Sequence, residues 1–393
     1  LVSVPREGLS LGSVGNGLSE PAVASLAPIP NGNHARRPSS KRLGFTQKAF
    51  FALKSCPYMG KDLTVVDLFC GAGGLSLGLK AAGFRIVKSV DHSSAATATY
   101  ARNLGAHVEA AEITEDTALP SVTLIAGGPP CQGFSTQRRG SRTDDRNGLV
   151  LNFAQIAIAL RPKMILIENV PGLLGARGHG ITSSLFALLE GQGFKHDSMV
   201  LNAADFGVPQ NRRRTIIVAW DPSRAKAFRF PTPTHAHKPT TVRDALAGLP
   251  PPLADFTEHP QYHNHLRVKM SERNTERIRF VPEGGGRLDI PEELQLNCHR
   301  GAAHRHLDVF GRMRWDEPGP TITAMFDNFT RGRFAHPSED RSITGREGAR
   351  LQSFPDWFKF KGPKKDVARQ IGNAVPPQLA EALGRELIHA CAP

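Results

Sequence analysis

Short apolar runs alternate with amphipathic runs between residues 64 and 221. Thr64–Phe69 and Arg85–Val90 have the length and composition of buried strands, and Gly73–Ala82 between them has helical spacing and is followed by Gly83. Strands that alternate with helices in this way predict an α/β fold with a doubly wound, mostly parallel sheet, because parallel neighbours need a crossover connection. The other elements expected here are strands at Val122–Ala126, Lys163–Ile167 and Thr215–Trp220, and helices at Leu149–Leu160 and Ile181–Glu190.

The pattern changes after Asp221. Residues 222–318 hold many prolines and show no clear hydrophobic period, so we expect a second, smaller module that is irregular and β-leaning. Regular patterning returns from residue 319 onward, and Gln378–Cys391 is predicted to be an amphipathic helix that returns to the first domain, 43–221. Residues 1–42 are rich in Gly, Pro, Ser and Asn and end in basic residues, which predicts a disordered basic tail.

The composition favours a polyanionic partner. The 393 residues carry a net charge of +13, with 40% apolar and 22% charged residues, as expected of a globular protein that binds nucleic acid. No apolar run is long enough to cross a membrane, and the start of the chain lacks a signal-peptide layout. The five cysteines are odd in number and widely spaced, which suits a reducing compartment such as the bacterial cytoplasm or nucleoid.

One cysteine lies in an unusual setting. Residues 127–135 read Gly-Gly-Pro-Pro-Cys-Gln-Gly-Phe-Ser and follow the apolar run Val122–Ala126 directly. The carboxyl ends of parallel strands are where open α/β sheets bind ligands, and the prolines and glycines define a rigid, sharp turn there. Cys131 is therefore a candidate nucleophile. Taken alone, a lone cysteine is more often a small buried apolar residue.

A glycine-rich turn follows the first predicted strand. Asp67–Gly74 reads Asp-Leu-Phe-Cys-Gly-Ala-Gly-Gly, and its glycines allow close approach of a ligand to the start of the next helix. Asp91, at the end of the second strand, is placed to accept hydrogen bonds from a ribose diol. The spacing differs from the dinucleotide pattern, so a nucleoside cofactor without pyrophosphate, such as S-adenosylmethionine, fits better than NAD. A simple packing turn is the alternative.

Two further polar groups are expected near Cys131. Glu168 follows the strand Lys163–Ile167 at the same sheet edge, and a thiol with a carboxylate suits addition to a heteroaromatic ring, where the acid binds the ring nitrogen. A helix cap or an ion pair is the plainer alternative for Glu168. Arg212 and Arg214 precede or begin a strand and point to one side, where either can neutralise a carbonyl or phosphate oxygen, unless the run is only a solvated surface.

Taken in order, these segments strongly resemble the C5-cytosine DNA methyltransferases. The resemblance runs from about residue 64 to 220 and from about 312 to 377. Its motifs are Asp67–Gly74, Gly128–Ser135, Asp145–Leu149, Glu168–Val170, Gln210–Arg214, Arg346–Pro355 and Gln370–Pro376.

The resemblance implies S-adenosylmethionine as the cofactor, and it implies a role for each matching residue of the site. Cys131 would be the nucleophile, Glu168 would engage the cytosine ring, and Arg212 and Arg214 would stabilise the base carbonyl and the site geometry. His92 stands where a larger aromatic ring often stacks on adenine, and Glu112 stands where Asp is more usual, so cofactor affinity is the property these departures affect. The implied cofactor contacts are Phe69, Gly71, Gly73, Gly74, Asp91, His92, Glu112, Ile113, Pro130, Leu149, Asn373 and Val375.

The resemblance also implies double-stranded DNA as substrate, with the target cytosine flipped out of the helix. The stretch 222–318 would be the target recognition domain, inserted between the catalytic domain 43–221 and the returning segment 319–393. We expect a monomer without membrane attachment in a bacterial restriction–modification or orphan role, with any cognate endonuclease acting separately. The expected DNA contacts are Ser135, Arg138, Arg139, Gln210, Arg267 and Lys269.

Two other functions stay open at this point. A tRNA cytosine-5 methyltransferase on the same fold would use the same chemistry, and a catalytically silent relative would only bind DNA. Seven side chains also invite a zinc hypothesis, but their spacing fits no standard finger, so we expect no metal. They are His259, His263, His265, Cys298, His299, His304 and His306.

Overall fold

The structure is a computed structural model that describes residues 63–130, 148–297 and 307–392. The chain divides after Arg42, and every described residue belongs to the compact unit Leu43–Pro393. Cys131 and the rest of the segment 131–147 lie outside the described residues. Within the described ranges, no helix is both long and apolar enough to cross a membrane.

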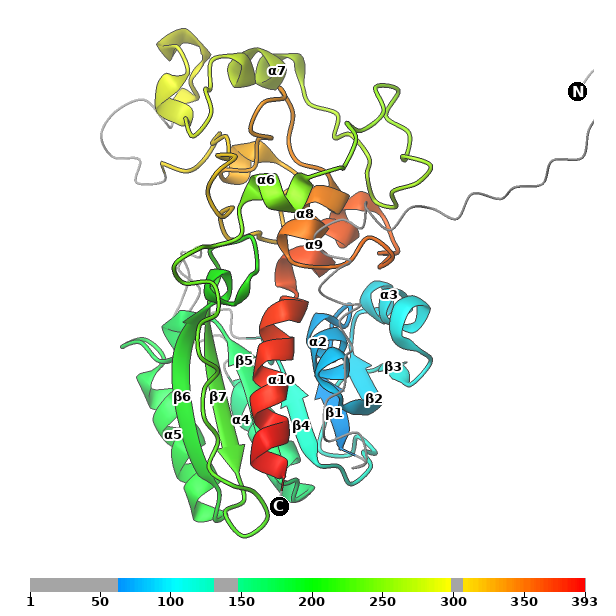
Figure 1. The fold of residues 1–393 in the computed structure, drawn as a ribbon, viewed down its shortest axis with the longest axis vertical. Coiled ribbons are helices and arrows are strands. Elements are labelled where there is room, and N and C mark those ends of the chain that lie inside the picture. Colours follow the sequence, from blue (N-terminus) through cyan, green and yellow to red (C-terminus); the bar gives the residue numbers. More distant parts are fainter. Residues whose placement is uncertain (1–62, 131–147, 298–306, 393) are drawn as a thin grey trace, which may run out of the picture. The chain divides into compact units, whose positions relative to one another are not determined.

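A seven-stranded sheet organises the larger part of the molecule (Figure 1). The strand order is β3-β2-β1-β4-β5-β7-β6, and β7 alone runs in the direction opposite to the other six strands. This confirms the predicted mostly parallel, doubly wound sheet. The strands are β1 (Thr64–Leu68), β2 (Arg85–Asp91), β3 (Val108–Ala110), β4 (Leu124–Gly127), β5 (Met164–Asn169), β6 (Lys195–Asn202) and β7 (Arg213–Trp220).

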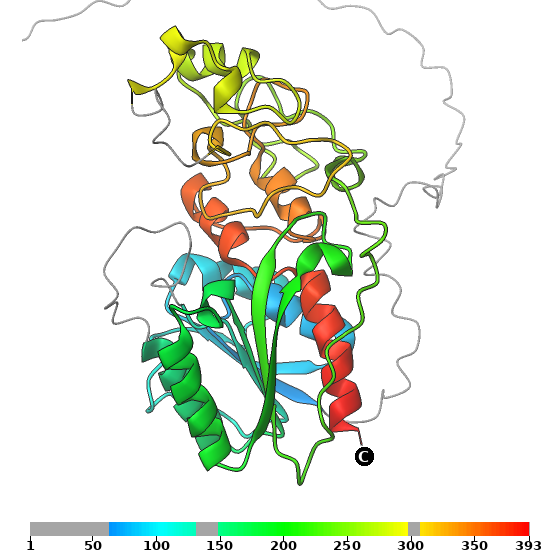
Figure 2. The same ribbon diagram turned by 90° about the vertical axis from the view of Figure 1, so that its left-hand side faces the viewer.

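Helices cover both faces of the sheet. Successive side chains of a strand point to opposite faces, so Val65 packs in one core and Val66 in the other. The α2 and α10 helices cover the first face, and α4 and α5 the second; Figure 2 shows α5 and α10 on opposite sides. These helices are α2 (Gly74–Ala82), α10 (Pro377–Cys391), α4 (Gly148–Ala159) and α5 (His179–Gly191).

The C-terminal helix returns to the first domain, as predicted. The α10 helix lies against α2, where glycines allow close contact: a Cβ on Gly78 would lie 2.3 Å from the Pro377 carbonyl, and one on Gly384 would lie 2.6 Å from Ala82 Cβ. The first and last helices of the described fold therefore form one layer.

Three elements of the sheet region were not predicted. The α3 helix (Ser94–Leu104) is capped by the Ser93 hydroxyl and followed by Gly105, both of which are readable signals. The β3 strand is only three residues long. The β6 strand forms the sheet edge and is largely polar, so it lacks the apolar run on which the strand predictions rested.

The region after Asp221 is irregular, as predicted, but the expectation that it leans toward β structure is wrong. Between residues 222 and 318 the described part contains α6 (Val242–Leu246), α7 (Glu272–Arg279) and short 3₁₀ turns, and no strand. Backbone carbonyls there find side-chain donors instead of a neighbouring strand. Arg312, for example, is buried and donates to the carbonyls of Ile278, Val281, His336 and Glu339. The 3₁₀ turns of the described residues are η3 (Pro171–Leu173), η4 (Ala203–Phe206), η5 (Arg287–Asp289), η6 (Glu292–Leu294) and η8 (Phe329–Arg331).

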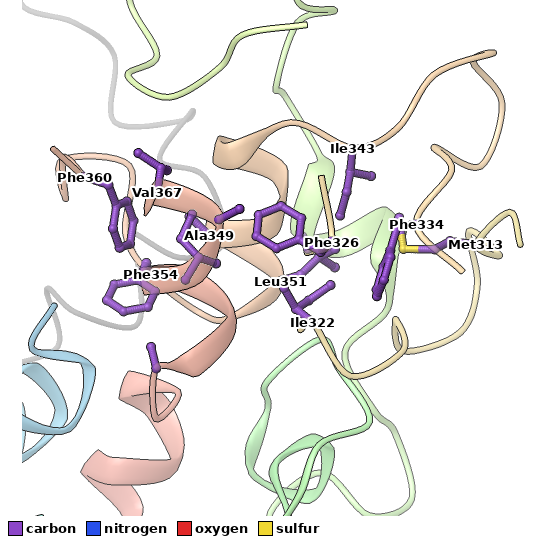
Figure 3. Packing of buried hydrophobic residues seen from close by; sticks show 14 of the residues in the cluster. Met313, Ile322, Phe326, Phe334, Ile343, Ala349, Leu351, Phe354, Phe360 and Val367 are labelled. Carbon is purple, nitrogen blue, oxygen red and sulfur yellow. The ribbon is translucent and has the colours of Figure 1, made fainter. Parts of the chain in front are cut away.

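One apolar core unites this irregular region with the segment that follows it (Figure 3). Met313 packs in the same cluster as Phe326, Leu351 and Phe354, and the cluster reaches Tyr100 of α3. The later segment supplies α8 (Gly345–Leu351) and α9 (Lys364–Asn373). The core is thus continuous across residue 318, and the domain boundaries stay a prediction.

Candidate active site

A cavity opens at the carboxyl ends of β1 and β4, where the strand order changes direction. Its volume is about 540 Å³, within the range of small-molecule sites. The segments 321–324 and 369–375 complete its lining opposite the sheet edge. The sequence-predicted residues that line it are Phe69, Gly71, Asp91, His92, Pro130, Glu168, Arg212, Arg214, Asn373 and Val375.

The β1–α2 turn forms the glycine-rich side of this cavity. Phe69, Gly71 and Gly73 all have positive φ, at 58°, 54° and 94°. A Cβ on Gly71 would meet nothing within 4 Å, so this glycine faces open space in the cavity. A Cβ on Gly74 would lie 2.3 Å from the Val375 carbonyl oxygen, so Gly74 instead allows the C-terminal segment to pack closely.

Asp91 fixes the rim of the glycine turn. Its two carboxylate oxygens accept hydrogen bonds from the backbone N–H groups of Gly71 and Ser93, each at 2.8 Å. Each oxygen keeps a second lone pair for a ribose hydroxyl. The exposed ring of His92 lies beside it at the cavity wall, with Nδ1 3.5 Å from Asp91 Oδ1. An open glycine cradle next to a held carboxylate fits a nucleoside cofactor.

A buried carboxyl group that we did not single out also lines the cavity. Asp67 Oδ2 accepts a hydrogen bond of 2.6 Å from Ser76 Oγ, which in turn accepts one from the Tyr100 hydroxyl. Asp67 Oδ1 has no hydrogen-bond partner in the described part of the chain. Burial raises the pKa of Asp67 to about 7, in spite of the Ser76 hydrogen bond. An aspartate within an apolar predicted strand was the signal for this group.

Glu168 lies at the end of β5, and its Oε1 has no hydrogen-bond partner among the described residues. Its Oε1 is 3.1 Å from Arg214 Nε, an ion pair without hydrogen-bond alignment. The side chain is largely buried yet lines the cavity. Its neighbour Asn169 donates from Nδ2 to the Pro129 carbonyl at 3.0 Å. This bond ties the end of β5 to Pro129, and the proximity of Glu168 to Cys131 stays a prediction because Cys131 lies outside the described residues.

The two predicted arginines line one cavity but differ in their partners. Arg214 pairs with Glu168, whereas Arg212 is 1% exposed and donates to backbone carbonyls. Burial lowers the pKa of both guanidinium groups, and their mutual repulsion lowers that of Arg212 further. Two guanidinium groups against one carboxylate give this end of the cavity a positive potential.

Several predicted cofactor residues do not line the cavity. Glu112 is exposed, Ile113 packs in the core under α4, and Leu149 is half-buried at the start of α4. Gly73 and Gly74 shape the turn without lining the cavity themselves.

The predicted DNA contacts have mixed outcomes. Ser135, Arg138 and Arg139 lie outside the described residues, and Arg267 and Lys269 lie away from the cavity lining, with Arg267 over the ring of Phe256. The prediction for Gln210 needs correction. Its side chain is fully buried, and its amide group donates to Leu351 O and Gln352 Oε1 and accepts from Ile322 N, so the side chain is held inside the protein and does not reach a ligand at the surface.

No cluster of three or more His, Cys, Asp or Glu side chains within the described ranges is arranged to hold a metal. His265, one of the seven side chains considered above, is buried and uses both ring nitrogens on Thr344 Oγ1 and the Pro250 carbonyl. The cysteine and the later histidines of that group lie outside the described residues.

Comparisons with known proteins identify the family of the chain. The family model for C-5 cytosine-specific DNA methylases matches residues 63–389. Type II methyltransferase M.NgoFVII of Neisseria gonorrhoeae is 34% identical over 82% of this chain and 86% of its own length. M1.HphI of Haemophilus parahaemolyticus, another type II methyltransferase, is 35% identical over 86% of this chain and 90% of its own.

Solved structures show the same relationship. A DNA modification methyltransferase encoded within an E. coli prophage superposes with a TM-score of 0.63 at 27% identity, covering 84% of this chain and 99% of that one. The S. pombe Dnmt2 methyltransferase, with a TM-score of 0.55, 19% identity and coverage of 84% and 99%, shares the fold. The glycine-rich turn, the carboxylates of Asp91 and Glu168 and the family match lead to one conclusion: this chain belongs to the C-5 cytosine-specific DNA methylase family.

Proposed function

We propose that this DNA methyltransferase transfers a methyl group from S-adenosylmethionine to C5 of a cytosine flipped out of duplex DNA, through a transient bond between Cys131 and C6. The observation that carries the proposal is the placement of Glu168, with a guanidinium partner and an oxygen that accepts no hydrogen bond within the described ranges, in the same cavity as the open glycine turn. A base and a nucleoside cofactor can therefore occupy one continuous space.

The chain's own residues account for activation of the base. The Cys131 thiolate adds to C6, the C5=C6 π electrons move toward C5, and the protonated carboxyl of Glu168 donates a hydrogen bond or its proton to N3, where negative charge develops, while its other oxygen accepts from the cytosine amino group. Arg214 neutralises the carbonyl oxygen. After C5 is methylated, its proton leaves to a base, the C5=C6 bond reforms and the Sγ–C6 bond breaks. The excess positive charge near Glu168 favours the thiolate form that the first step needs.

The cofactor would be held on the other side of the cavity. Gly71 leaves room for close approach, Asp91 accepts hydrogen bonds from the ribose, and Asn373 and Val375 close the space from the C-terminal segment. When bound there, S-adenosylmethionine supplies an electrophilic methyl group. The same residues exclude water from the reacting atoms.

Duplex DNA is the proposed substrate because the family model describes DNA methylases, the curated relatives are named type II methyltransferases, and one solved relative is named a DNA modification methyltransferase. The target atoms are stacked inside the duplex, so the cytosine has to leave the helix to enter the cavity. Residues 222–318, with Arg267 and Lys269, are proposed as the recognition region. A restriction–modification role follows by analogy with the type II relatives.

Bisulfite sequencing tests the proposal. Plasmid DNA from a methylation-deficient host that expresses the chain is compared with DNA from hosts expressing Cys131→Ala or Cys391→Ala. Cys391 is a buried cysteine in α10 and serves as the matched thiol control. We expect protected cytosines in one sequence context for the wild type and Cys391→Ala, and none for Cys131→Ala. Protection that persists in Cys131→Ala refutes the assignment of Cys131 as the nucleophile. Protection found in host tRNA and not in the plasmid would show that the substrate is RNA.

A further inference from the structure

Arg212 and Gln210 together form a buried link, here called the carbonyl clamp, between β7 and two distant segments. Arg212 Nη1 donates to the Ile322 carbonyl at 3.0 Å, and Nη2 donates to the carbonyls of Gly372 and Ala374 at 3.0 and 2.9 Å. Gln210 accepts from Ile322 N at 2.7 Å. The segments 321–324 and 372–375 both lie more than a hundred residues after the clamp residues in the sequence.

The clamp joins the two halves of the cavity. The carbonyls that it holds flank Asn373 on the side proposed for the cofactor. Two residues along the chain, Arg214 pairs with Glu168 on the side proposed for the target base. Arg212 therefore has direct bonds to the cofactor side and a short, rigid backbone connection through β7 to the base side.

The environment of Arg212 makes this link sensitive to displacement. The guanidinium is fully buried, its Nε has no hydrogen-bond partner among the described residues, and its hydrogen bonds all go to neutral carbonyls. A buried donor that loses its acceptor costs roughly 1–3 kcal/mol, and more when it is charged. If segment 372–374 moves, the guanidinium of Arg212 either moves with it or resists the movement through its hydrogen bonds.

We infer that Arg212 is a positioning residue that couples occupancy of the cofactor side of the cavity to affinity for DNA carrying the target cytosine. The inference rests on the proposed function. Arg212 itself touches no reacting atom in this role: it holds segments 321–324 and 372–374 in the positions that suit both ligands. By linkage, each ligand then raises the affinity for the other by the same factor.

The test measures that factor directly. The dissociation constant of S-adenosylhomocysteine is determined by calorimetry, without DNA and with saturating duplex that carries the methylation site found by bisulfite sequencing. For the wild type we expect DNA to tighten cofactor-product binding by roughly tenfold or more, within the range typical of coupled sites. For Arg212→Ala we expect the ratio to fall to within about twofold of one. Addition of methylguanidinium, which can fill the vacated space, should restore it.

Three comparisons separate coupling from simple damage. Arg213→Ala removes an exposed arginine from the same run and should keep the wild-type ratio. If Arg212→Ala does not fold by circular dichroism, Arg212→Lys replaces it, with the same expected loss of coupling. A wild-type ratio in a folded Arg212 variant overturns the inference. A wild type that binds neither ligand refutes the proposed function instead, so the two failures are distinguishable.

Discussion

Glu347→Gln tests what stabilises the segment that follows the irregular region and shares its apolar core. Glu347 is buried at the start of α8, where Arg341 donates to both of its carboxylate oxygens at 2.7 and 2.8 Å and Thr344 N donates to one at 2.7 Å. His336 Nε2 lies 3.9 Å away, and Glu339 also pairs with Arg341. Arg341 and the Thr344 backbone outweigh the effect of burial and lower the pKa of Glu347 from 4.5 to about 2.

The magnitude follows from this shift. A pKa that falls by about 2.5 units corresponds to about 3 kcal/mol of stability, at about 1.4 kcal/mol per unit. Because the folded pKa is depressed, this contribution is fully present above pH 4.5 and is lost as the pH falls through about 2. At pH 3.5, linkage removes about 1 kcal/mol of it. A protonated Glu347 resembles glutamine, so the wild type and Glu347→Gln should converge at low pH.

Thermal melts at pH 7 and pH 3.5 provide the measurement. For a protein of this size we expect Glu347→Gln to melt about 4 °C below the wild type at pH 7, and about 2 to 3 °C below it at pH 3.5. Asp316→Asn is the control, since Arg243 pairs with Asp316 in a similar two-bond geometry at the surface and its loss should matter little. A deficit for Glu347→Gln that stays constant or grows as the pH falls would show that packing, not charge, accounts for the loss.

Two other substitutions address the cofactor side of the cavity. Gly74→Ala should weaken S-adenosylhomocysteine binding by about tenfold or more, since the new Cβ would lie 2.3 Å from the Val375 carbonyl and must push that segment away; unchanged affinity in calorimetry would contradict this packing role. Asp67→Asn should stabilise the ligand-free protein at pH 8, because burial raises the pKa of Asp67 from 3.8 to about 7 and wild-type stability falls as the pH rises across that window. The gain in melting temperature should shrink toward pH 4, and a gain independent of pH would refute the assignment.

Local sequence patterns were sufficient to predict strands β1, β2, β4, β5 and β7 and to place Asp91 and Glu168 at strand ends. Asp91 and Glu168 follow apolar strands, so their meeting at one edge is a consequence of parallel strand geometry. The edge strand β6 escaped prediction because one face of it meets water. The reversed direction of β7 also has no local signal, since it depends on which neighbours the strand pairs with.

The other half of the site depends on contacts that sequence spacing does not encode. Arg212 and Gln210 looked available to a ligand, yet their partners near Ile322 and Gly372 are more than a hundred positions away. A buried arginine on carbonyls and an exposed arginine on phosphate have the same appearance in a single sequence. The same limit applies to the irregular region, where buried arginines such as Arg312 replace strand pairing.

The position of α10 has a consequence for synthesis of the chain. Leu383 and Leu387 of this helix cover apolar side chains of the first strands, such as Val65, which leave the ribosome more than three hundred residues earlier. Until α10 emerges, one face of the sheet lacks much of its cover. Nascent chains at that stage expose an apolar surface of the kind that chaperones bind and that promotes aggregation. Completion of the fold is therefore delayed until translation has passed this helix.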